Sequence, residues 1–147
     1  MTIYEKINND ITAALKSGDK FTLSTLRMFK SAMDQVKTNQ RDIPNDDEVI
    51  TTLRKQIKLR ESSKEEYIKY ERIDLADDLK KEIDILDSYL PEELSLDEIE
   101  KLIDEVFEEL KPESIKDMGN IMKLMTGKVA GRYDMGKVSS MVREKLN

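Results

Sequence analysis

Apolar residues recur every three or four positions along most of this chain, the spacing that places them on one face of an α-helix. Four such stripes precede Pro91 and three follow it. The first four consist of Ile3, Ile7, Ile11 and Leu15; Leu23, Leu26, Phe29, Met33 and Val36; Val49, Ile50, Leu53, Ile57, Tyr67 and Ile68; and Leu75, Leu79, Ile83, Leu86 and Leu90. The last three consist of Leu96, Ile99, Leu102, Ile103, Val106, Phe107 and Leu110; Ile115, Met118, Ile121, Met122, Met125 and Val129; and Val138, Met141, Val142 and Leu146. The pattern predicts an all-α fold with seven helices.

Residues whose side-chain oxygens can cap a helix precede these stripes. We expect the helices to start at Thr2, Asp19, Asp46, Asp74, Ser95, Ser114 and Asp134. Thr2 and Ser95 are each followed three residues later by Glu, which makes two capping boxes. Glycine accepts the left-handed conformation that closes a helix. We therefore expect Gly18 to end the first helix, and Gly127 and Gly131 to mark the end of the sixth.

A proline divides the seven predicted helices into two groups. Pro91 disfavours a helical conformation for the residue before it, so the fourth helix should end by Leu90. We place the domain boundary at 90–94. The expected architecture is multihelical, with an N-terminal four-helix bundle at 1–90 followed by a small C-terminal three-helix bundle at 95–147.

The composition excludes several kinds of site. Among its 147 residues the chain has no cysteine and no histidine, which rules out a Cys nucleophile, a His general base and a disulfide framework. We assign no catalytic residue and no metal ligand, and expect no cofactor. The sequence has no signal peptide and no apolar run of membrane-spanning length, so we expect a cytoplasmic protein without a membrane partner.

Charge is distributed unevenly along the chain. The net charge is −6, but residues 76–110 have 3 basic and 14 acidic residues, whereas residues 111–147 have 8 basic and 4 acidic residues. The segments therefore carry −11 and +4, and residues 1–75 carry +1. A local positive field can persist at the C-terminal end because charges are screened over about 8 Å at physiological salt.

The basic end supplies the main candidate binding residues, Lys116, Lys123, Lys128, Arg132 and Lys137. Lysines beside a basic turn can neutralise phosphates, and free N–H groups at the start of the last helix can add anion contacts. The alternative interpretation is an ordinary solvated helix face. From the residues alone, both interpretations stay open, and the solvated face is the more common case.

The segment 131–138 nearly matches a nucleotide-binding P-loop, because glycine, four residues, glycine and lysine follow in order. Val138 stands where the motif needs Ser or Thr, with Ser139 one place late. The motif also needs a preceding strand, whereas the preceding residues have a helical pattern. We therefore interpret the segment as a turn followed by an N-capped helix.

Three strings in the C-terminal part of the chain are distinctive: Lys116-Asp117-Met118-Gly119, Gly131-Arg132 and Asp134-Met135-Gly136-Lys137-Val138-Ser139. Through them the chain closely resembles the C-terminal part of YqeY-like proteins, which is similar to the tail domain of the B subunit of glutamine-dependent tRNA amidotransferases. The resemblance is not confined to this part of the chain. It continues upstream through Leu26-Arg27, Lys58-Leu59-Arg60-Glu61-Ser62, Arg72-Ile73-Asp74-Leu75-Ala76 and Tyr89-Leu90-Pro91. Two positions depart from the pattern: Thr126 replaces a proline, and Tyr70-Glu71 replaces a small residue and a glycine.

The resemblance implies the same two helical bundles, tRNA or a tRNA-handling complex as partner, and a link to carbon–nitrogen ligase activity with glutamine as amido-N-donor. The chain has no Cys glutaminase nucleophile, no Gly/Ser-rich amidase stretch and no convincing ATP site, so we do not expect it to be catalytic alone. Our hypothesis is a tRNA-interacting accessory module. The alternative is a protein–protein adaptor with no nucleic-acid role, which would use the acidic segment or the methionine-rich C-terminal helices.

A second candidate polar site comprises Arg60, Arg72 and Asp74, through which the resemblance also passes. Charged residues at such spacings on a helix are most often surface ion pairs that contribute little. The more specific interpretation is a second basic surface or a polar contact between the two bundles. Both interpretations remain open at this point.

Overall fold

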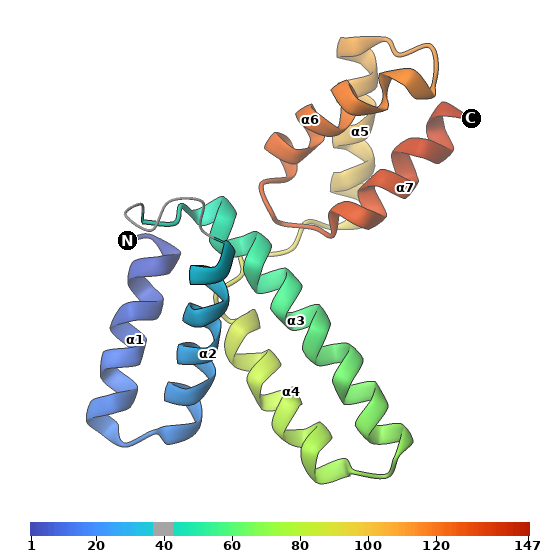
Figure 1. Ribbon diagram of the computed structural model, residues 1–147. Coiled ribbons are helices and arrows are strands. Elements are labelled where there is room, and N and C mark those ends of the chain that lie inside the picture. The colour runs from blue at the N-terminus through green and yellow to red at the C-terminus, as the bar shows by residue number, and fades with distance from the viewer. Residues whose placement is uncertain (37–42) are drawn as a thin grey trace. The chain divides into compact units, whose positions relative to one another are not determined.

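The computed structural model describes residues 1–36 and 43–147, and it divides into two compact units, Met1–Leu90 and Pro91–Asn147. The first unit has helices α1 (Ile3–Ser17), α2 (Lys20–Val36), α3 (Asp46–Lys69) and α4 (Ile73–Asp87). The second has α5 (Leu96–Leu110), the 3₁₀ turn η1 (Ile115–Asp117), α6 (Met118–Val129) and α7 (Met135–Leu146) (Figure 1). The described residues form no strand, and the prediction of an all-α fold is confirmed.

Several helix starts follow the predicted capping chemistry. Thr2 accepts a hydrogen bond from the N–H of Glu5 at 3.1 Å, and the Glu5 carboxylate accepts from the N–H of Thr2 at 3.2 Å. Asp19 accepts hydrogen bonds from both the hydroxyl and the N–H of Thr22. These bonds, the one from the hydroxyl first, lower the pKa of the Asp19 carboxyl. Ser95 accepts from the N–H of Glu98, but the Glu98 carboxylate accepts from the Ser95 hydroxyl and not from its N–H, so the predicted second capping box forms only in half. The bonds donated by N–H groups each satisfy a backbone donor that the first turn leaves free.

Three boundary predictions are wrong. Ser114 does not start the sixth helix, because it caps the 3₁₀ turn η1, and α6 starts only at Met118. Asp74 does not cap the fourth helix: α4 starts at Ile73, its N-cap position is Arg72, and Asp74 lies within the first turn. Gly127 does not end the sixth helix, because α6 continues to Val129 and closes through Ala130 and Gly131, both with positive φ. A residue other than glycine adopts the left-handed conformation there, which the sequence pattern does not reveal.

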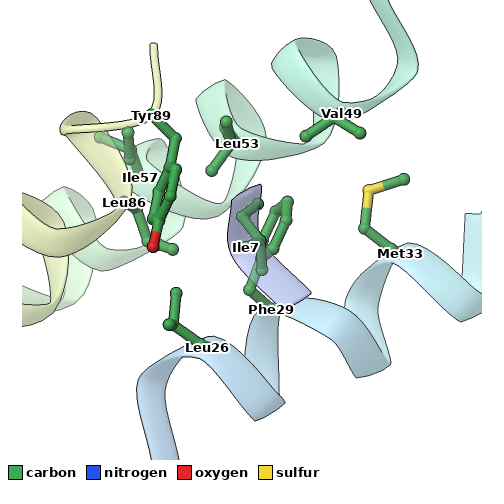
Figure 2. Packing of buried hydrophobic residues seen from close by; sticks show 9 residues of the cluster. All are labelled: Ile7, Leu26, Phe29, Met33, Val49, Leu53, Ile57, Leu86 and Tyr89. Carbon is green, nitrogen blue, oxygen red and sulfur yellow. The ribbon is translucent and has the colours of Figure 1, made fainter. Parts of the chain in front are cut away.

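The core of the first unit gathers side chains from all four of its helices (Figure 2). Its buried members are Ile7, Leu26, Phe29, Met33, Val49, Leu53, Ile57, Leu86 and Tyr89. Most of them lie on the stripes expected from the sequence. Val36 was also expected to face inward, but its side chain is not among those that the structure describes. Tyr89, after the end of α4, brings a polar hydroxyl into this cluster, which the apolar pattern does not predict.

The second unit has a separate core built from α5, α6 and α7. Its buried members are Leu94, Ile99, Ile103, Val106, Ile121, Met125, Val129, Val138 and Val142. Met118, Met122, Met135 and Met141 pack partly buried against them. Together with the buried Met125, these four methionines help to fill the core of a small bundle. Ile115 differs from the prediction: it is 50% exposed, because the residue lies in η1 and not in the helix that the stripe implied.

Candidate nucleic-acid interface

The five basic residues expected to form one surface lie on different parts of the second unit. Lys116 is in η1, Lys123 is in the middle of α6, and Lys128 is in its last turn. Arg132 follows in the connection to α7, and Lys137 is in the first turn of α7. Five residues along a helix correspond to a rotation of about 500°, so Lys123 and Lys128 lie about 140° apart around α6. The five side chains therefore do not share one face.

Three of the five are brought together by the connection between α6 and α7. Val129 and Met135 bound this connection, so the end of α6 and the start of α7 lie close along the chain. Lys128, Arg132 and Lys137 all belong to this end of the second unit, which we call the basic turn. Lys116 lies at the opposite end of α6, about 18 Å away along its axis.

The lysines of the basic turn are exposed and have no carboxylate partner. The ion pairs found in the described part of the chain join Arg60 to Glu82, Arg72 to Asp74 and Lys145 to Asp104, and none involves Lys128 or Lys137. Both side chains are exposed to solvent. Their charges are therefore available to an anionic ligand.

Two carboxylates close to candidate cations, Asp134 in the basic turn and Asp117 beside Lys116, have structural roles instead. Asp134 accepts a hydrogen bond from the N–H of Gly136 at 2.8 Å and so caps α7. Asp117 accepts from the N–H groups of Glu113 and Ser114 at 2.9 Å and 3.3 Å, and the bond to Ser114 is part of a capping box at the start of η1. A carboxylate at a helix N-terminus offsets the partial positive charge of the helix. These two acids are engaged with backbone and not with the lysines.

Arg132 differs from the two lysines because it is tied into the fold. Its Nε donates to the carbonyl oxygen of Glu92 at 2.8 Å, and its own carbonyl oxygen accepts from the N–H of Leu94 at 2.8 Å. This pair of bonds fastens the segment before α5 to the basic turn. Arg132 is half-buried, so its first role is structural, and only part of its guanidinium can serve a ligand.

Tyr133 is half-buried and packs against the core of the second unit. Bases of single-stranded nucleic acid are held mainly by stacking on exposed aromatic rings. The basic turn therefore presents charges without an exposed ring from Tyr133, which favours contacts with phosphates over contacts with bases.

The segment that resembles a P-loop has the geometry of a capped helix start. Residues 131–134 form a turn, α7 begins at Met135, and α6 precedes the turn where a P-loop would require a strand. Gly131 has a φ of 75°, a left-handed conformation that closes α6. The interpretation as a turn and an N-capped helix is confirmed.

The second candidate polar site separates into two ion pairs. Arg60 on α3 binds Glu82 on α4, with 3.3 Å between Nε and Oε1, and these side chains are only 11% and 15% exposed. Arg72 forms a bidentate ion pair with Asp74 on an exposed part of the chain: Nε donates to Oδ1 at 3.2 Å and Nη2 donates to Oδ2 at 3.1 Å. The guanidinium lowers the pKa of Asp74 chiefly through these hydrogen bonds. Arg60 lies about 14 Å along α3 from Lys69, so it does not reach the Arg72 pair.

Glu82, the partner of Arg60, was not among the residues that the sequence pattern indicated. Arg60 lies three residues after the buried Ile57, on the stripe that faces the core. A charged residue on such a stripe needs a partner, because burying an unpaired charge is costly. That position was the signal available in the sequence, although it does not identify the partner on α4.

No group of three or more acidic side chains in the described ranges is arranged to hold a metal ion. The helices of the described part also contain no segment with the length and apolar character needed to cross a membrane.

Comparison with known proteins identifies the family. A family model described as "Yqey-like protein" matches residues 4–146, nearly the whole chain. The chain belongs to the YqeY-like family. The resemblance inferred from the sequence motifs is thus confirmed.

Two relatives show how far this similarity extends. The chain is 33% identical over 89 residues to "Uncharacterized protein C22F3.15" of Schizosaccharomyces pombe, a match that covers 60% of this chain and 72% of the relative. It is 27% identical over 149 residues to "Altered inheritance of mitochondria protein 41, mitochondrial" of Pyrenophora tritici-repentis, a match that covers 97% of this chain and 82% of the relative. Neither name states a ligand or a reaction.

Proposed function

We propose that this YqeY-like protein is an accessory module that binds tRNA, or a tRNA-handling complex, through the basic turn of its C-terminal unit. The observation that carries the proposal is that Lys128 and Lys137 are exposed and unpaired, while Asp134, the carboxylate in the same turn, is engaged in the cap of α7. Cations held in this way can neutralise phosphates and release the counterions that surround them.

The likeness of the family to the tail of the amidotransferase B subunit supports tRNA as the anionic polymer. In that setting the protein would contribute to glutamine-dependent amide transfer as a binding partner, and the ligase chemistry would belong to another protein. The candidate cations contact phosphates and carry no sequence readout, so recognition would depend on the shape and backbone of the RNA.

The placement of the cations also ranks them. Lys128 and Lys137 should contribute most, because they flank one turn. Lys123 and Lys116 should contribute less, because Lys123 lies on another side of α6 and Lys116 at its far end. Replacing Arg132 should affect the stability of the unit as well as binding, because its guanidinium and its backbone both hold the segment before α5.

The test is a titration of the intact protein with tRNA across a series of salt concentrations. Lys128→Glu and Lys137→Glu should each weaken binding by roughly tenfold and reduce the slope of log affinity against log salt by about one. Lys101→Glu is the matched control, since Lys101 is an exposed, unpaired lysine on α5 of the same unit and undergoes the same charge change. Absence of binding at low salt would refute the proposal, as would equal losses in the control and the two variants.

A further inference from the structure

The first unit exposes an apolar surface at the far end of the α3–α4 hairpin, which we call the hairpin tip and define as residues 64–78. Its large apolar side chains are Tyr67, Ile68, Tyr70 and Ile73, which are 37%, 50%, 66% and 53% exposed. Isolated apolar residues are normal on a protein surface, but four large ones within seven positions form a group. Such groups often mark interaction surfaces.

The hairpin tip lies beyond the core of its own unit. Along α3 the buried cluster ends at Ile57, and along α4 it is reached again only at Ile83 and Leu86. Between these positions α3 and α4 pack against each other, as Figure 1 shows, and are joined by the Arg60–Glu82 pair. The four apolar side chains of the hairpin tip are therefore not packed against the core of the first unit.

The hairpin tip is also acidic. Residues 64–78 include six acidic and three basic residues, a net charge of −3. One of the three bases, Arg72, is already bound by Asp74 through two hydrogen bonds. A partner for this surface should therefore be apolar and basic.

The same unit carries a surface of the opposite character on α2. Residues 20–31 include three basic residues and no acidic one, a net charge of +3. One face of α2 lines an open hollow of about 340 Å³, formed by Lys20, Leu23, Ser24, Arg27, Met28 and Ser31. Met28 is 46% exposed, and Phe21 beside this face is 39% exposed. We call this surface the α2 face.

We propose that the hairpin tip of one copy docks on the α2 face of a second copy, and that a two-fold axis repeats the contact to form a dimer. The two surfaces carry equal and opposite charge, and each exposes apolar side chains. A cavity of about 150 Å³ already accommodates a benzene ring, so the hollow has room for the ring of Tyr67 or Tyr70. A two-fold arrangement covers both surfaces on both copies and leaves neither exposed.

The test is sedimentation velocity of the full chain over a range of protein concentrations at low and high salt. The wild type should form a dimer that weakens as salt rises, because the contact is partly electrostatic. Lys20→Glu with Arg27→Glu should raise the dimer dissociation constant at least roughly tenfold, and so should Glu65→Lys with Glu66→Lys. Lys55→Glu with Lys58→Glu is the matched control on exposed positions of α3, and it should leave the dimer unchanged.

The decisive measurement mixes the two weakened variants. In the mixed pair, the acidic tip of one variant meets the unchanged basic α2 face of the other, and the reversed basic tip meets the reversed acidic face. Both contacts are then complementary, so the mixture should form a heterodimer although neither variant dimerises alone. Circular dichroism and the thermal midpoint of each variant verify that it is folded.

Three results would overturn the proposal: a wild type that stays monomeric at its highest soluble concentration, a dimer insensitive to both reversals, or a mixture that does not pair. A monomeric wild type would leave the hairpin tip open to a different partner, such as a basic helix of another protein. The proposal concerns the first unit only, so its failure would leave the tRNA proposal for the second unit unaffected.

Discussion

At the scale of single residues, Tyr89 and Asp10 form the most unusual contact of the first unit. The hydroxyl of Tyr89 donates to Oδ2 of Asp10 over 2.5 Å, and the ring of Tyr89 also receives the ammonium of Lys6 at 5.6 Å from its centre. Burial of the ring, followed by the hydrogen bond and the charge of Asp10, raises the pKa of Tyr89. The contact links α1 to the end of α4 across the core, and a pattern of apolar positions cannot predict it.

The raised pKa makes the stability of the first unit depend on pH at the alkaline end. The folded state holds the phenol proton more tightly than the unfolded state, whose tyrosine has its ordinary pKa of 10.0. The contribution of Tyr89 is therefore complete below pH 10 and is lost as pH rises toward the pKa of the folded state. Tyr89→Phe keeps the ring and removes the hydroxyl, so at neutral pH it should cost about 1 kcal/mol.

Urea unfolding of the wild type and Tyr89→Phe at a series of pH values measures this effect. The difference between their unfolding free energies should be largest below pH 10 and should shrink above it. Other tyrosines and lysines titrate equally in both proteins, so they cancel in the difference. A gap that stays constant across the whole series would show that the hydroxyl of Tyr89 is not buried against Asp10.

At the scale of elements, Gly127 and Gly131 have different roles, although both were expected to mark the end of the sixth helix. Gly127 lies inside α6, and a Cβ built on it meets no atom within 4 Å. Gly131 has a φ of 75°, where a side chain causes strain. The left-handed Ala130 before it helps to close the helix, so α6 ends at Val129, two residues beyond Gly127.

Alanine substitutions at these two glycines should therefore have opposite effects. Gly127→Ala should stabilise the second unit by about 0.5–1 kcal/mol, because alanine loses less entropy in a helix interior. Gly131→Ala should destabilise it by about 1 kcal/mol, because alanine is strained at this φ. Thermal or chemical unfolding of the two variants measures both changes. Destabilisation by Gly127→Ala would instead support the helix end at Gly127 that the sequence pattern indicated.

At the scale of the whole molecule, the two units have separate cores. The buried cluster of the first unit contains no residue beyond Tyr89, and that of the second begins at Leu94. Each bundle is small, and small cores leave a narrow margin of stability. Each unit should therefore respond to the loss of its own core side chains.

Matched truncations in the two cores test this independence. Leu53→Ala and Ile121→Ala each remove a fully buried side chain, one from each unit, and should cost about 2–5 kcal/mol. Hydrogen exchange resolved by segment should show faster exchange in helices α1–α4 for the first variant and in α5–α7 for the second. Faster exchange throughout the chain in either variant would show that the two units unfold as one.

The sequence by itself determined the helical class, the stripes that face each core and most of the caps. It could do so because helix periodicity and capping depend on residues within four positions of one another. The family motifs were also readable, since they are local strings such as Gly131-Arg132 and Asp134-Met135-Gly136. Thr2 with Glu5 and Asp134 with α7 are examples in which this local information was sufficient.

Only the tertiary structure decided which residues meet across the chain. It paired Arg60 with Glu82, tied Arg132 to Glu92 and Leu94, and placed the hydroxyl of Tyr89 against Asp10. It also left the apolar side chains of the hairpin tip exposed. These outcomes depend on how packed helices bring distant positions together, and the spacing of residues along one helix holds no information about its neighbours.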